Sequence, residues 1–244
     1  MPTSKSPPIA NRLLAALPRK DYQLLTRHLE EIPLVFGEVL YRPNELMSDV
    51  YFPNSGIVSL LAGVNERSTL EVGFVGNDGI VGLSVFLGVD SSLNRAVVQG
   101  AGSAMKMKAT TFRKECNKGG ALPRLLQRYS QSALAQITQY AVCNQFHSVD
   151  ARLARWLLMT NDRMGDDQFQ LTQQFLSNML GVRREGVSVA AGNLQKRKLI
   201  RYSRGHLKVL DRDGLEATSC VCYEIIKNES NGSESNGSES NGSH

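Results

Sequence analysis

Residues 171–200, LTQQFLSNMLGVRREGVSVAAGNLQKRKLI, constrain the fold more than any other part of the chain. Apolar residues recur at helical spacing on both sides of Gly181, which predicts two amphipathic helices joined by a tight turn. Thr172 is placed to cap the first helix, and Gly181 suits the left-handed conformation that ends it. We expect the second helix to begin at Arg183. Its buried stripe should consist of Val187, Ala190, Ala191 and Leu194.

The opposite face of the second helix carries polar side chains near its N-terminus. Arg184, Glu185 and Ser188 lie there, where a recognition helix approaches base edges in the major groove of DNA. Arginine pairs with guanine O6 and N7, and glutamate accepts from the cytosine amino group. The expected contacts to DNA phosphates come from Thr172, Gln173, Arg183, Lys196, Arg197 and Arg204.

The residues that follow predict a wing. Ile200–Tyr202 and His206–Leu210 have strand character and flank a turn at Arg204-Gly205, as in a winged helix-turn-helix. Residues 183–212 include nine Lys and Arg residues but only two acidic residues, Glu185 and Asp211. This excess of positive charge favours a polyanionic partner. Spacing alone leaves a second interpretation open, namely a helical hairpin with a solvated basic face.

The preceding sequence divides into helical and strand-rich parts. Two short helices are expected near the N-terminus, split at Pro18. From residue 35 to 107, short apolar runs alternate with Gly, Pro, Asn and Asp, which is typical of a β-roll or sandwich. A long helical pattern follows, and then a helix capped by Ser148. The apolar stripe of the long helix is either plain core or a seam between two chains; it comprises Leu122, Leu126, Tyr129, Ala133, Ile137, Tyr140 and Cys143.

With these features in this order, the chain resembles the Crp/Fnr transcription factors of bacteria over roughly residues 33–222. The resemblance rests on YFPNSGIVSLL, GNDGIVGLSVFLG, DARLARWLL, the segment 171–200 and RGHLKVLD. It implies an α+β protein with a β-roll like that of cyclic-nucleotide-binding domains, a dimerisation helix and a winged helix-turn-helix. The implied boundaries are N-terminal helices 1–32, β-roll 33–118, dimerisation helix 119–146, DNA-binding domain 147–222 and disordered tail 223–244.

The resemblance also implies a function. A homodimer would read an inverted repeat in double-stranded DNA and regulate transcription, with RNA polymerase as a further partner. Arg184 and Glu185 match the family's base-reading pair, and Ser188 matches a position often occupied by Ser or Gly. Val189 stands at the fourth base-reading position, where arginine is usual, so the family's usual half-site cannot be assumed. A valine there either contacts a thymine methyl or simply packs.

The β-roll departs from relatives that bind cyclic nucleotides. Those relatives carry Gly-Glu in the phosphate loop, whereas this chain has Gly82-Leu83-Ser84, followed later by Arg95-Ala96. Leu83 cannot accept the hydrogen bond of a ribose hydroxyl. We therefore expect weak or no cyclic AMP binding at this candidate ligand pocket. A regulator of the same family that depends on a cyclic nucleotide, or on another small-molecule effector, is the alternative.

Several other functions are disfavoured. The histidines are scattered and no HExxH, GxSxG or P-loop motif is present, so no enzyme is predicted. The four cysteines lack CxxC pairs and zinc-finger spacing, and we expect reduced thiols without a metal, a cluster or a cofactor. The sequence also lacks a membrane-spanning apolar run or a signal peptide, and a cytoplasmic location is expected. The SNGSE repeat predicts disorder from about Lys227. This tail is either part of the natural sequence or an addition made for expression.

Overall fold

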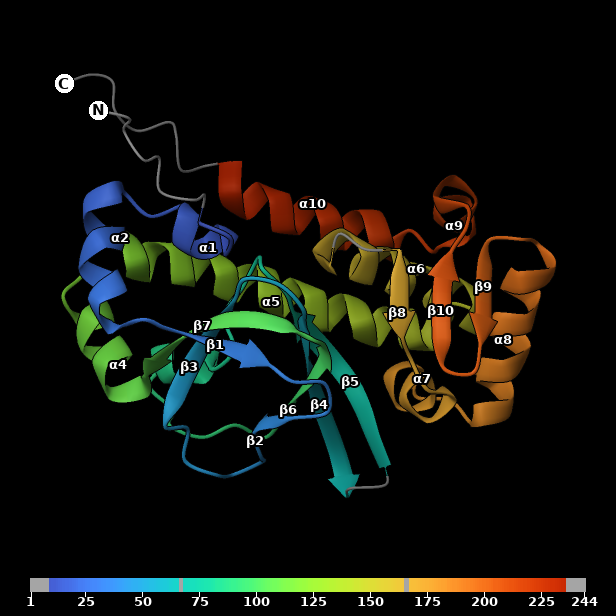
Figure 1. The fold of residues 1–244 in the computed structure, drawn as a ribbon, viewed down its shortest axis with the longest axis horizontal. Coiled ribbons are helices and arrows are strands. Elements are labelled where there is room, and N and C mark those ends of the chain that lie inside the picture. Colours follow the sequence, from blue (N-terminus) through green and yellow to red (C-terminus); the bar gives the residue numbers. More distant parts are fainter. Residues whose placement is uncertain (1–8, 66–67, 165–166, 236–244) are drawn as a thin grey trace.

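The N-terminal half is a roll of two antiparallel sheets, with strand orders β1-β7-β3 and β2-β6-β4-β5, around one apolar core. The computed structural model describes residues 9–65, 68–164 and 167–235 (Figure 1). The elements of the roll are α1 (Arg12–Ala15), α2 (Arg19–Leu25), η1 (Thr26–His28), β1 (Glu30–Leu34), β2 (Val39–Tyr41), β3 (Asp49–Pro53), β4 (Ile57–Asn65), β5 (Ser68–Val75), α3 (Leu83–Phe86), β6 (Arg95–Gly100), β7 (Gly102–Lys108) and α4 (Ala109–Asn117).

The C-terminal half is mainly helical and contains a small third sheet. Its strands follow the order β8-β10-β9. The elements are α5 (Ala121–Phe146), α6 (Val149–Met164), β8 (Gln168–Gln170), α7 (Gln173–Leu180), α8 (Arg184–Lys196), β9 (Ile200–Ser203), β10 (His206–Val209), α9 (Arg212–Thr218) and α10 (Cys222–Ser235). The expected α+β class, with a roll, a long helix and a winged helix-turn-helix, is confirmed.

Helix α5 runs along the long axis of the molecule, and α10 lies beside it (Figure 1). Four of the stripe residues expected on α5, namely Leu122, Leu126, Tyr140 and Cys143, are buried within the chain, so that part of the stripe is core. Another face of α5 leaves Leu134 60% and Ile137 42% exposed, with Ala141 exposed next to them. Among the described residues, Leu134 and Ile137 therefore contribute to an exposed apolar surface of α5, as do Val142 and Phe146 nearer its end. No helix among the described residues combines the length and apolar character needed to cross a membrane.

Helix α6 joins the two halves through Trp156. The Trp156 indole packs edge-on against Phe74 of β5 and Phe175 of α7, with ring centroids 6.4 and 5.9 Å apart. Its Nε1 donates a hydrogen bond of 3.0 Å to Glu71, whose other carboxyl oxygen accepts from Ser59 at 2.6 Å. Because Phe74 and Trp156 belong to one buried apolar cluster that also holds the helix-turn-helix core, the roll and the C-terminal half share a core.

The structure corrects three expectations about secondary structure. Strand β1 begins at Glu30, inside the segment expected to hold only N-terminal helices. Residues 168–170, expected in a turn-rich connector, form β8, because their backbone pairs with β10. The tail expected to be disordered from Lys227 is helical through Ser235, because Tyr223 and Ile226 are buried against the preceding helices and start the helix. Residues 236–244 lie outside the described part of the chain.

The buried carboxyl of Glu71 makes stability depend on pH. Burial raises the pKa of Glu71 to about 8, although Ser59, Trp156, Arg155 and Arg163 oppose the shift. The folded chain therefore retains a proton that the unfolded chain releases above about pH 4.5. This group's contribution to the free energy of unfolding consequently falls as the pH rises from about 4.5 to 8.

We predict that Glu71→Gln removes this pH dependence. A neutral amide can accept from Trp156 and donate to Ser59, so the variant should match the wild type near pH 5. It should exceed the wild type in melting temperature by several degrees above pH 8. Calorimetric melting across this range is the measurement, with the exposed Glu45→Gln as control. Parallel curves for wild type and Glu71→Gln would contradict the assignment.

Candidate nucleic-acid interface

The turn between α7 and α8 is fixed by local hydrogen bonds. The Thr172 hydroxyl accepts from the Phe175 amide at 3.1 Å, and this confirms the expected cap of α7. Gly181 has φ 59° and ψ 37°, the left-handed conformation that favours glycine, and a Cβ there would lie 2.7 Å from Leu70 of β5. The Ser177 hydroxyl donates to the Val182 carbonyl across the turn at 2.5 Å. The turn is therefore tightly specified and lies against the roll.

Helix α8 has one buried and one exposed face. Val187, Ala190, Ala191 and Leu194 are buried, as expected, while Arg183 caps the helix and Arg184 is its first residue. The side chains on the other face are exposed; they are Arg184, Glu185, Ser188 and Val189. Val189 is 62% exposed, so it does not serve the core of the chain. The structure thus brings all four residues with a predicted base-reading role together on the first two turns of α8.

Arg184 is oriented by α7. Its Nε donates a hydrogen bond of 2.7 Å to Gln174 Oε1, and Gln174 in turn donates to Asn178 at 3.0 Å. The two terminal nitrogens of Arg184 take no partner among the described residues. A guanidinium held at Nε loses less conformational entropy when its terminal nitrogens meet the two acceptors of guanine. Sequence reasoning missed Gln174, which lies in the first turn of α7, because its contact with Arg184 depends on how α7 packs against α8.

Polar contacts from α6 fix the orientation of both helices. Asn193 of α8 donates to the Asp150 carboxylate at 2.9 Å, which joins α8 to the first turn of α6. Arg152, buried on α6, donates to the Leu180 carbonyl at the end of α7 and to Asn144 of α5 at 2.6 Å. The recognition helix is therefore held by α6 as well as by its own hairpin.

The expected wing forms from β9 and β10, with β8 as a third strand that the sequence analysis missed. The turn contains Arg204 at φ 50° and Gly205 at φ 80°, and Arg204 is exposed. The Tyr202 hydroxyl donates to the Leu171 carbonyl at 2.9 Å, which joins the wing to the start of α7, and burial raises the pKa of Tyr202. The wing is therefore fixed relative to the helix-turn-helix.

The residues expected to contact phosphate lie at three places, and all are exposed. Thr172 and Gln173 begin α7, and Arg183 precedes α8. Lys196 and Arg197 lie at the opposite end of α8, about 18 Å from Arg184 along the helix axis at 1.5 Å per residue. Arg204 stands at the tip of the wing. The first group lies at the N-terminal ends of α7 and α8, as do the residues predicted to read bases, whereas Lys196 and Arg197 are separated from them.

The candidate ligand pocket of the roll lies at the start of α3 and on β6. Gly82 adopts φ 98° before α3, and Leu83 packs against the apolar core of the roll, to which the buried Ala96 also belongs. The Ser84 hydroxyl contacts Met47 Sδ at 3.8 Å. The Nε of Arg95 is buried and has no hydrogen-bond partner among the described residues. The pocket thus retains a cation, but Leu83 is engaged in apolar packing.

A winged helix-turn-helix attached to a β-roll by a long helix defines a class of DNA-binding regulators, and comparison with known proteins agrees. Residues 151–218 match a family described as the Crp-like helix-turn-helix domain. Comparison with curated proteins found no significant match. Residues 151–218 therefore form a Crp-like helix-turn-helix domain, and the chain has the fold of Crp/Fnr transcriptional regulators, as the resemblance predicted.

Solved structures show the same fold across most of the chain. FixK2 from Bradyrhizobium japonicum is 17% identical, with a TM-score of 0.67 over 79% of this chain and 98% of its own. The c-di-GMP-responsive regulator CLP of Xanthomonas campestris is 17% identical, with a TM-score of 0.63 over 79% and 99%. A putative Crp/Fnr regulator from Eubacterium rectale is 18% identical, with a TM-score of 0.62 over 84% and 96%.

Proposed function

We propose that this protein is a homodimeric, sequence-specific transcription regulator that acts in the cytoplasm and reads an inverted repeat in double-stranded DNA. The observation that carries the proposal is the exposed N-terminal face of α8, where Gln174 orients Arg184 beside Glu185, Ser188 and Val189. The buried face of α8 packs onto the domain, so this exposed face is available to enter a major groove. RNA polymerase is the further partner that a regulator of this kind engages.

The proposed roles follow from position. Arg184 reads guanine, Glu185 accepts from cytosine, and Ser188 and Val189 contact the neighbouring bases, with the Val189 methyl groups suited to a thymine methyl. Thr172, Gln173 and Arg183 hold phosphates near the groove, and Arg204 holds one beside the wing. Lys196 and Arg197 contact a more distant stretch of the DNA backbone.

The proposed dimer forms through α5. Leu134, Ile137 and Ala141 occupy one exposed face at a spacing of three and four residues, which is the pattern of a two-helix seam. Two copies related by a twofold axis would present two α8 helices to half-sites one DNA turn apart. The roll is proposed as the effector-sensing part, in contact with the helix-turn-helix through Leu70 and Trp156.

We expect Arg184→Ala to weaken binding to the specific site about 10- to 100-fold, because a bidentate contact to guanine contributes about 1–3 kcal/mol of discrimination. The site is first selected from random duplexes, and affinities for this site and for unrelated DNA are then compared by fluorescence anisotropy. Affinity for unrelated DNA should hardly change. The exposed Arg19→Ala on α2 is the matched control. An equal loss on both DNAs would make Arg184 a phosphate contact instead.

Ile137→Glu should convert the dimer to a monomer, because a charge without a partner would be buried in the α5 seam. Sedimentation velocity gives the oligomeric state directly. Leu93→Glu, at a position 80% exposed on the roll, is the control and should remain dimeric. A monomeric wild type, or a dimeric Ile137→Glu variant, would refute the proposed seam.

The alternative, dependence on cyclic AMP, is favoured only by the buried Nε of Arg95, which has no hydrogen-bond partner among the described residues. Because Leu83 offers no acceptor to the ribose hydroxyl, we expect no saturable heat when cyclic AMP is titrated into the protein at physiological concentrations. Isothermal titration calorimetry is the measurement. A micromolar isotherm, lost on Arg95→Ala, would establish the alternative.

A further inference from the structure

Three cysteines and a histidine from distant parts of the chain meet behind the DNA-binding domain. They are Cys143 and His147 at the end of α5, and Cys220 and Cys222 where α9 leads into α10. Their four candidate ligand atoms all lie within 4.8 Å of one another. The three cysteines are buried and none is in a disulfide, while His147 is half-buried. The proposed DNA-binding function does not use any of the four.

Local structure explains why the four side chains converge. Cys143 and His147 are four residues apart, so they lie one above the other on one face of α5, and His147 is the C-cap of that helix. Cys220 and Cys222 are both buried, whereas Val221 between them is 64% exposed. The chain therefore turns both thiols inward at the start of α10. The Cys-x3-His and Cys-x-Cys pairs match neither CxxC nor zinc-finger spacing, so the sequence alone did not predict this cluster.

The distances fit one tetrahedral metal ion. Cys143 Sγ lies 3.4 Å from Cys220 Sγ, and Cys222 Sγ lies 3.4 Å from His147 Nδ1. Zinc–sulfur bonds of about 2.3 Å and zinc–nitrogen bonds of about 2.0 Å place tetrahedral ligands about 3.5–3.8 Å apart. A cubane iron–sulfur cluster needs wider spacing, because four irons lie between its thiolates. A disulfide would join two of the thiols and leave the third and His147 unexplained.

Two buried arginines complement the charge of such a site. Arg152 is 6% and Arg155 2% exposed, and both interact electrostatically with Cys143 and Cys220. Neither is in an ion pair with a carboxylate of the described residues, although Arg155 interacts electrostatically with the buried Glu71, and the Nε of each lacks a hydrogen-bond partner there. Buried cations need a compensating anion. Zinc with three thiolates and one neutral imidazole carries a net charge of −1 and would supply it.

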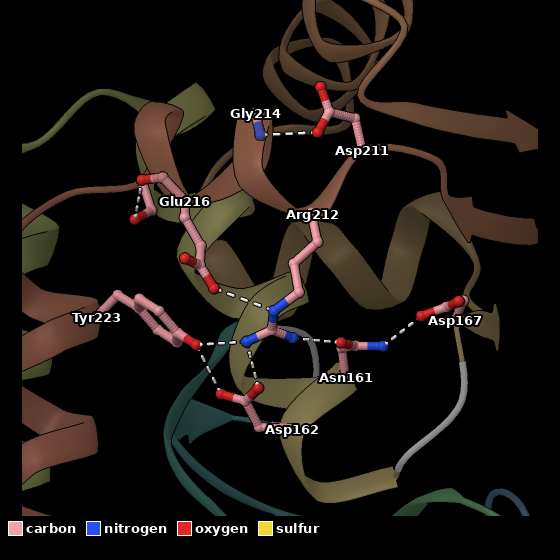
Figure 2. A network of polar contacts seen from close by, with 9 residues as sticks. Asn161, Asp162, Asp167, Asp211, Arg212, Gly214, Glu216 and Tyr223 are labelled. Atoms are coloured by element: carbon pink, nitrogen blue, oxygen red, sulfur yellow. Dashed lines mark hydrogen bonds and ion pairs between the residues drawn. The ribbon is translucent and has the colours of Figure 1, made fainter.

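Neighbouring contacts hold the ligands in place. Gln139 Nε2 donates to Cys222 Sγ at 3.0 Å, the kind of outer contact that orients a metal-bound thiolate. Figure 2 shows Arg212 at the centre of a network that joins α9 and α10 to α6. Its guanidinium bonds Asp162 at 2.7 Å and the Tyr223 hydroxyl at 2.9 Å, and that hydroxyl donates to Asp162 at 2.8 Å. Because Tyr223 adjoins Cys222, the network places both C-terminal thiols opposite α5.

We propose that Cys143, His147, Cys220 and Cys222 form a structural zinc site that fastens the end of α5 to the segment between α9 and α10. All four positions of a tetrahedron are filled by protein, which is the arrangement of structural rather than catalytic zinc. The ion would close a large loop between residues 147 and 220, which contains the entire helix-turn-helix and wing. Metal binding therefore stabilises the DNA-binding domain against the long helix.

The first test is the metal content of the full chain. Purified wild type should hold about one zinc ion per chain by plasma mass spectrometry. Cys143→Ala and Cys220→Ala should hold less than about a tenth of that, while Cys116→Ala, at a buried cysteine of α4 outside the cluster, should match the wild type. A wild type that contains no zinc and shows no thiolate-to-cobalt absorption with Co²⁺ would overturn the proposal. Bound iron with sulfide, or a Cys143–Cys220 disulfide in the purified protein, would also overturn it.

A second variant, His147→Ala, tests the site independently of whether the cysteine variants fold. His147 is only half-buried, so His147→Ala should keep the wild-type circular dichroism but lose at least about tenfold in zinc affinity, measured by competition with a chromophoric chelator. His147→Cys should restore the affinity as a four-cysteine site. Chelation of wild-type zinc should lower the melting temperature, and added zinc should restore it. Unchanged affinity in His147→Ala, or a melting temperature insensitive to chelation, would refute the site even if DNA binding is normal.

Discussion

The arrangement of the whole chain depends on the buried hydrogen bond from Trp156 to Glu71. It joins the central helix α6 to a strand of the roll, and the same indole touches Phe175 at the start of the helix-turn-helix. A carboxyl in this position is stable only when neutral or fully hydrogen-bonded, and here both oxygens are used. The roll therefore cannot move against α6 without exposing or orphaning a buried polar group. The roll and α6 therefore cannot slide gradually past each other, because intermediate positions would break this buried hydrogen bond.

The same helix carries the groups that orient the reading surface. Arg152 holds the end of α7, and Asp150 holds α8 through Asn193, so the direction of α8 follows that of α6. A change in the roll would reach the exposed face of α8 by this route, because Phe74 and the part of β5 around Leu70 contact α6 and the helix-turn-helix. The physical connection between the roll and α8 is thus short and consists of packed side chains.

Much of the fold was predictable because its signals are local. The Thr172 cap, the left-handed Gly181 and the buried stripe of α8 each depend on a few adjacent residues, and the structure contains all three. The failures involve distant partners. Strand β8 exists because β10 supplies its hydrogen bonds, and α10 persists because α5 and α6 bury Tyr223 and Ile226. On the interface, the exposed positions were predictable from periodicity, but the Gln174 contact to Arg184 required knowing how α7 lies against α8.

The cysteine–histidine cluster shows why the spacing of residues in the sequence did not predict a candidate metal site. Cys143 and Cys220 are separated by the entire DNA-binding domain in sequence, yet their sulfurs lie 3.4 Å apart. Between α5 and α6 only His147 and Ser148 are non-helical, so the position of α6 relative to α5 depends on side-chain contacts. These include the Trp156–Glu71 hydrogen bond to the roll and the Arg152–Asn144 hydrogen bond to α5. The cluster joins the end of α5 to the start of α10, which packs on α6, so an ion there would add a restraint on any movement of α6 that reorients α8.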